Sequence, residues 1–81
     1  MEPEHVPIVR VLNDLANLSV TRGKYPEAEQ YYLRSIAIIE HSQGLEHPDL
    51  IDMLNKLVEL YIRQGRYYDA LTMAQRALAL A

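Results

Sequence analysis

The chain repeats part of its own sequence 42 positions further on. The segment LNDLANLSVTRGKYPEA at residues 12–28 returns as LNKLVELYIRQGRYYDA at residues 54–70, and most of the pairs that differ exchange one apolar residue for another. Self-similarity at one fixed spacing of this size indicates an array of repeats, each of which is one supersecondary unit. We therefore expect two equivalent units that stack on each other.

Each copy is expected to form two helices, because its apolar residues recur at spacings of three and four, the period of one helix face. No segment alternates with a period of two, so no strand is predicted. The first helix is predicted to follow an extended lead-in at residues 1–7 that ends with Pro7 in the first turn of the helix. It is predicted to end near Arg22, since Gly23 can adopt the left-handed conformation that closes a helix. Its predicted inward residues are Ile8, Leu12, Leu15, Ala16 and Ser19.

The second helix is predicted at residues 25–41, with Pro26 in its first turn, where the missing N–H would have no partner anyway. A turn of about two residues forces the two helices to be antiparallel, so Ala28 is expected where their backbones approach most closely. The predicted inward residues of this helix are Tyr25, Ala28, Tyr32, Ser35, Ile36 and Ile39.

A loop is predicted at residues 42–47, where Gly44 is available for a positive φ. The third helix is predicted to begin at Pro48 and to end before Gly65, and the fourth to cover residues 67–80. The inward residues predicted for the third helix are Leu50, Ile51, Leu54, Leu57, Val58 and Tyr61. Those predicted for the fourth helix are Tyr67, Ala70, Leu71, Ala74, Ala77 and Leu78.

Composition argues against several classes of protein. The 81 residues carry a formal net charge of -3, which argues against binding to nucleic acid. They contain no cysteine, so disulfides and thiolate metal sites are ruled out. No apolar run approaches the roughly 18 residues of a membrane span, and the first residues lack the apolar region of a signal peptide. We therefore expect a cytoplasmic protein that binds neither nucleic acid nor membranes.

The residues at these positions resemble the tetratricopeptide repeat, a helical hairpin with a Gly-x-Tyr-x-x-Ala junction between its helices. The first copy matches this pattern with Leu12, Leu15, Ala16, Gly23, Tyr25, Ala28, Tyr32 and Ser35, and the second with Leu54, Leu57, Val58, Gly65, Tyr67, Ala70, Ala74 and Ala77. The 42-residue spacing and the segment GLEHPDL at residues 44–50 look like the longer repeats of kinesin light chains and their bacterial relatives.

This resemblance implies an all-α fold in which two antiparallel helix-turn-helix repeats, four helices in all, stack as a short right-handed solenoid. The first repeat would cover about residues 5–41 and the second about residues 47–81, in one domain that is part of a longer array or self-associates. Ser19, Val58 and Ala74 depart from the family pattern. We expect Ala74, which stands in place of a bulky aromatic, to leave a hole that costs on the order of 1–3 kcal/mol unless a neighbouring unit fills it.

Stacked hairpins place their first helices along a concave groove, whose residues are candidates for binding a peptide or a partner protein. Asn13 and Asn55 occupy the same repeat position, and an amide can both donate to and accept from a peptide backbone, a role that the resemblance to kinesin light chains implies. Alternatively, both amides are simply solvated. The charges are mixed, so no particular cargo is predicted. The full candidate set is Arg10, Asn13, Asn17, Thr21, Asp52, Asn55, Glu59 and Arg63.

Catalysis and metal binding have less support in the sequence. No serine stands at a recurring spacing from a base and no Gly-rich loop precedes a helix, so neither an enzymatic activity nor a cofactor is predicted. A Zn²⁺ site would need His41 and His47 with nearby carboxylates, Glu40, Glu46 and Asp49. Both histidines are explained by positions near helix ends, so no metal site is predicted.

An alternative function is structural. Two hairpins are fewer than the three or so that usually make an array self-sufficient, so apolar end faces are expected to stay uncovered. The alternative is therefore a self-assembly element that forms homo-oligomers through its end helices. The residues expected in these faces are Ile8 and Val11 at one end and Leu71, Leu78 and Leu80 at the other.

Overall fold

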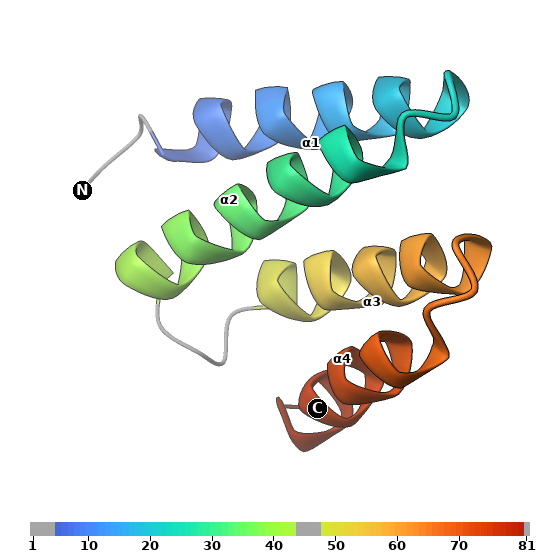
Figure 1. Ribbon diagram of the computed structural model, residues 1–81. Helices are drawn as coiled ribbons and strands as arrows, with labels where there is room; N and C mark the ends of the chain where they lie inside the picture. Colours follow the sequence, from blue (N-terminus) through green and yellow to red (C-terminus); the bar gives the residue numbers. More distant parts are fainter. Residues whose placement is uncertain (1–4, 44–47, 81) are drawn as a thin grey trace.

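The computed structural model describes residues 5–43 and 48–80, which form four α-helices (Figure 1). They are α1 (His5–Thr21), α2 (Tyr25–Gln43), α3 (Pro48–Arg63) and α4 (Tyr67–Leu80). These ranges contain no strand, so the predicted all-α class is confirmed. The order of packing is α1 against α2, α2 against α3, and α3 against α4, which is a short stack of two hairpins.

The helix bounds differ from the predicted ones at two ends. α1 begins at His5, inside the predicted extended lead-in, and Pro7 lies in its first turn as predicted, where no N–H donor is needed. α2 continues to Gln43, past the predicted end at His41. The positive φ expected of Gly44 lies outside the described residues.

Both hairpin turns close in the same way. Gly23 and Gly65 each have a φ of 75°. The N–H of Lys24 donates to the carbonyl of Ser19 at 2.8 Å, and the N–H of Gly23 donates to the carbonyl of Val20 at 2.9 Å. The turn at Gly65 repeats both bonds, at 2.8 and 3.0 Å. This pair of bonds is the Schellman closure, which satisfies the last carbonyls of a helix, so the predicted helix ends are confirmed.

The core runs through the whole stack. Ala16 of α1 and Ala28 of α2 are fully buried, which is expected of small residues between two packed helices. Two serines, Ser19 and Ser35, are also buried. The buried apolar residues are Leu12, Ala16, Ala28, Tyr32, Ile36, Ile39, Leu50, Met53, Leu54, Leu57, Leu60, Tyr61, Ala70 and Ala77.

Five residues predicted to face inward are in fact exposed: Ile8 and Leu15 of α1, and Tyr67, Leu71 and Leu78 of α4. Helical periodicity identifies an apolar face, but it does not show whether a second helix covers that face. α1 and α4 lie at the two ends of the stack, where no further helix of the described residues packs on them (Figure 1). The prediction of burial was therefore wrong for Leu15 and Tyr67. Ile8, Leu71 and Leu78 were also expected in uncovered end faces, and their exposure agrees with that second expectation.

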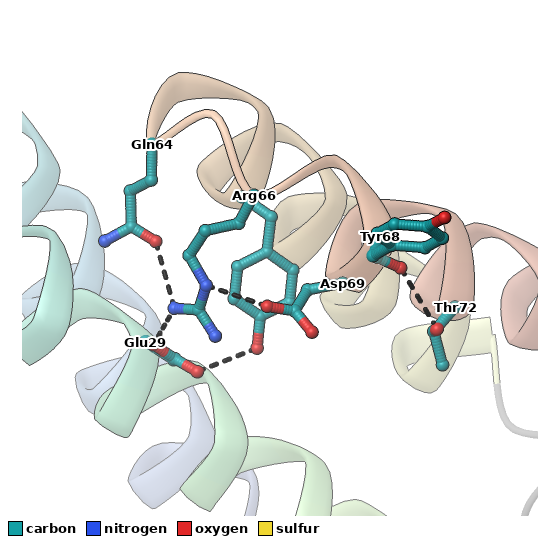
Figure 2. A network of polar contacts seen from close by, with 7 residues as sticks. Glu29, Gln64, Arg66, Tyr68, Asp69 and Thr72 are labelled. Atoms are coloured by element: carbon teal, nitrogen blue, oxygen red, sulfur yellow. Dashed lines mark hydrogen bonds and ion pairs between the residues drawn. The ribbon is translucent and has the colours of Figure 1, made fainter.

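A polar cluster joins the two hairpins, and Figure 2 shows it from close by. Glu29 of α2 accepts hydrogen bonds from the Tyr61 hydroxyl and from the Arg66 guanidinium, both at 2.8 Å. Arg66 also donates to Asp69 at 2.8 Å, and its Cζ lies 4.4 Å from the centroid of the Tyr61 ring. We call Glu29, Tyr61, Arg66 and Asp69 the inter-hairpin latch.

The latch raises the pKa values of two of its members, Tyr61 and Arg66. Burial raises the pKa of Tyr61 to about 12, and the hydrogen bond to Glu29 acts in the same direction. The hydrogen bonds to Glu29 and Asp69 hold the pKa of Arg66 above its ordinary value. A neutral phenol and a charged guanidinium are therefore both favoured by the folded state.

Replacing Gly23 by alanine is expected to lower the free energy of unfolding by about 1–2 kcal/mol, because a residue with a Cβ is strained at this positive φ. A Cβ at this position would meet no atom within 4 Å, so the cost comes from the backbone alone. Gly23→Asn should lose less, since asparagine tolerates the left-handed region. Urea denaturation measures both variants, with Arg22→Ala as the neighbouring control. Equal stability of the alanine and asparagine variants would contradict the turn geometry.

The contribution of Tyr61 to stability is expected to depend on pH. Because its folded-state pKa of about 12 lies above the ordinary 10.0, this contribution is complete below pH 10.0 and is lost as the pH rises from 10.0 to about 12. Tyr61→Phe should therefore be less stable than the wild type near neutral pH, and the difference should shrink toward pH 12. Urea denaturation at a series of pH values tests this, with the exposed Tyr68→Phe as control. A difference that stays constant with pH would show that the latch does not favour the neutral phenol.

Candidate peptide-binding groove

All eight candidate residues line two adjoining hollows between α1 and α3. The larger hollow, of about 470 Å³, is lined by Val9, Arg10, Asn13, Asp52, Met53, Asn55, Lys56 and Glu59. The smaller one, of about 230 Å³, is lined by Asn17, Val20, Thr21, Tyr32, Lys56, Glu59, Leu60 and Arg63. Lys56 and Glu59 line both hollows, so the two are parts of one trough. We call it the α1–α3 trough.

The trough follows from the repeat and the helical period together. Both α1 and α3 carry polar residues at spacings of three and four, which places these residues along one edge of each helix. The apolar edges of the same helices face the core, where Leu12 and Ala16 of α1 and Leu54 and Leu57 of α3 are buried. Because the two hairpins repeat each other, their polar edges lie on the same side of the stack.

Asn13 and Asn55 line the same hollow but differ in their surroundings. Asn55 is exposed, whereas Asn13 is half-buried. The Oδ1 atom of Asn13 is buried and has no hydrogen-bond partner among the described residues. A buried acceptor without a donor costs free energy, so Asn13 is the side chain of the trough with the clearest unmet hydrogen-bonding capacity.

Asn17 is already used as an acceptor inside the protein. The hydroxyl of Tyr32 donates to Asn17 Oδ1 at 2.8 Å, and the hydroxyl of Thr21 donates to the Asn17 backbone carbonyl at 3.0 Å. Burial, together with the charge of Glu59, raises the pKa of Tyr32, so the phenol remains a donor. Toward a ligand, Asn17 therefore offers mainly its amide N–H groups.

Sequence reasoning missed six residues of the trough. Four are apolar, Val9, Val20, Met53 and Leu60, and the other two are Lys56 and Tyr32. Lys56 lines both hollows, and its spacing of four from Asp52 and three from Glu59 would have placed it on the same helix edge. Tyr32 comes from α2 and was predicted only as a core residue. Its ring is buried, yet it also lines the smaller hollow, and nothing in the periodicity of α2 indicates this second role.

The trough carries charges of both signs. Arg10, Lys56 and Arg63 supply three cations, while Asp52 and Glu59 supply two carboxylates. Such a surface does not strongly favour a ligand of one sign, in contrast to a uniformly basic groove. The structure therefore keeps the mixed character that the sequence predicted.

The described part of the chain has neither a metal-binding cluster nor a membrane-spanning helix. Within residues 5–43 and 48–80, no group of three or more His, Cys, Asp or Glu side chains gathers where it could hold a metal ion. Glu46 and His47, which belong to the zinc set considered above, lie outside these ranges. None of the described helices combines the length and the apolar character that a membrane span requires.

Comparison with known proteins agrees with this geometry. A search of curated proteins finds no match to the chain. The family model of the tetratricopeptide repeat matches residues 7–81, a range that includes both glycine turns and all eight candidate residues. Four helices packed as two hairpins are the architecture that this match implies. The chain therefore belongs to the tetratricopeptide repeat family.

Proposed function

We propose that the chain is a protein-binding module that holds an extended peptide segment in the α1–α3 trough and catalyses no reaction of its own. Tetratricopeptide repeats are generally protein–protein interaction modules, and the chain belongs to that family. The observation that carries the trough as the binding site is that Asn13 and Asn55, equivalent residues of the two repeats, line the same hollow.

The chemistry of the two amides suits a peptide backbone. Each asparagine side chain has an acceptor oxygen and two N–H donors, which pair with the N–H and C=O of an extended chain without reading its side chains. The Oδ1 of Asn13 has no donor among the described residues, so a peptide N–H that drew it outward would supply one. Pairing this oxygen with a peptide N–H would contribute to the affinity.

The size of the trough limits the length of the bound segment. Val9 and Thr21 lie at the two ends of its α1 wall, and a helix rises about 1.5 Å per residue, so this wall is about 18 Å long. An extended chain rises about 3.3 Å per residue, so the trough holds about five residues. The mixed charges favour a segment that is neutral or carries both signs.

The double substitution Asn13→Ala and Asn55→Ala is expected to weaken peptide capture by about ten- to a hundredfold. Two amide groups that each contribute about 1 kcal/mol of net hydrogen bonding account for this range. A pool of immobilised random pentapeptides serves as the probe, and bound protein is measured against the wild type. Circular dichroism verifies that the helical signal is unchanged.

The matched control replaces two exposed amides outside the trough, Gln30→Ala and Gln75→Ala, and should leave capture unchanged. Capture that survives the asparagine substitutions would rule out the amide pair as the binding element. A wild type that captures no member of the pool would rule out the trough as a general peptide site.

A second candidate function is self-assembly through the ends of the stack. Ile8 and Val11 at one end and Leu71 and Leu78 at the other are exposed, as expected of end faces that another protein surface covers. Contiguous exposed apolar residues are typical of interaction sites. This candidate does not compete with the first, because the end faces and the trough are lined largely by different residues.

A further inference from the structure

The joint between the two hairpins shows which kind of surface fits the outer face of α1, because α3 has the repeat position of α1 and its outer face is covered there. The face of α3 at this joint has four apolar residues, each at most 5% exposed: Leu50, Met53, Leu57 and Leu60. The equivalent residues of α1, 42 positions earlier, are instead between 38% and 54% exposed; they are Ile8, Val11, Leu15 and Leu18. Each helix has its own hairpin partner, but only α3 also packs against α2 of the preceding hairpin. The exposed set, which we call the head face, is therefore the surface that a helix like α2 covers.

The outer face of α4 is the counterpart of that covering helix. Ile36 of α2 is 4% exposed, whereas its equivalent in α4, Leu78, is 77% exposed. Tyr25, Glu29, Tyr32 and Ile36 lie along one face of α2 at spacings of four, three and four, and their equivalents in α4 keep these spacings. We call this set the tail face; it consists of Tyr67, Leu71, Ala74 and Leu78.

Each face combines an apolar ridge with an adjacent hollow. The hollow beside the head face has a volume of about 460 Å³ and is lined by Ile8, Val11, Leu12, Arg34 and Ile38. The hollow beside the tail face has a volume of about 280 Å³ and is lined by Ile51, Asn55, Val58, Ala74, Ala77 and Leu78. The hole expected at Ala74 is thus present. If α4 lay on α1 as α2 lies on α3, Leu78 would reach the first hollow and the α1 ridge would cover the second.

We propose that the tail face of one copy of the chain binds the head face of a second copy in the arrangement that α2 and α3 have within one chain. This inference rests on the second function proposed above and specifies its geometry. The interface is heterologous, because it joins two different surfaces. An assembly of any size keeps one free head face and one free tail face, so copies add without closing into a dimer.

The joint between copies lacks the inter-hairpin latch. The positions of Glu29, Tyr61 and Arg66 are occupied in the repeat equivalents by Leu71, Ser19 and Lys24. The two contacts of Glu29 at the inner joint therefore have no counterpart between copies, and mainly apolar contact holds the copies together. The inner joint also has an ion pair between Glu40 and Arg76, and Arg34 has the repeat position of Arg76. Association is expected to be reversible on dilution, at concentrations where each chain stays folded.

Two variants that each destroy one face test the geometry. The head variant carries Val11→Glu and Leu15→Glu, and the tail variant carries Leu71→Glu and Leu78→Glu. All four side chains are exposed, so the helical circular dichroism should be retained. If the head variant loses helical signal, Val11→Glu alone, at the most exposed position of its face, replaces it.

Sedimentation equilibrium measures the masses. The average mass of the wild type should rise continuously with concentration, and each variant alone should remain a monomer. An equimolar mixture of the two variants should form a dimer and nothing larger, because it contains one intact head and one intact tail per pair. The matched control, Leu33→Glu with Tyr68→Glu, changes two exposed apolar residues outside both faces and should associate like the wild type.

The contrary outcomes separate two failures. A wild type that stays monomeric at all concentrations overturns self-assembly as a function. A head or tail variant that dimerises by itself, or a mixture that stays monomeric, overturns the head-to-tail geometry while leaving self-assembly by another surface. Loss of association in the control variant also overturns the assignment of the two faces.

Discussion

Helix α2 is packed on two sides, by α1 within its hairpin and by α3 across the joint, and the rest of the structure depends on this double burial. Ile36 and Ile39 of α2 belong to the same buried cluster as Leu50 and Leu54 of α3. Burial of apolar surface contributes about 25 cal/mol per Å² to stability, so the cluster that these residues share stabilises the contact between the hairpins. Because α1 and α3 both pack on α2, their polar edges face a common trough, whose wall includes Tyr32 of α2.

Equivalent residues of the two repeats have different environments because their neighbours differ. Ile36 and Leu78 have the same place in the repeat, yet the first is in the core and the second is on the surface. The latch shows the same dependence on position, since Glu29 contacts Arg66 only because a second hairpin follows the first. Within a repeat array, a side chain's role is therefore set by its repeat position together with the helices on either side.

Much of this organisation could be predicted from the residues alone. The glycines at positions 23 and 65 and the spacing of the apolar residues predicted four helices, and the 42-residue offset identified eight side chains that line one trough. The latch could not be predicted, because Glu29 and Arg66 are 37 residues apart in the sequence and meet only after α2 packs on α3. The exposure of Leu15 and Tyr67 was also missed, since periodicity does not report the number of neighbouring helices.

The order of packing also has a kinetic consequence. Each helix packs mainly against the helix before or after it in the chain, so most contacts are local in sequence, and local contacts favour rapid folding. In a stack of this kind, local unfolding can begin with the helix at either end and spread toward the middle. Amide hydrogens in α1 and α4 should therefore exchange with solvent before those in α2 and α3, where two neighbours must separate first.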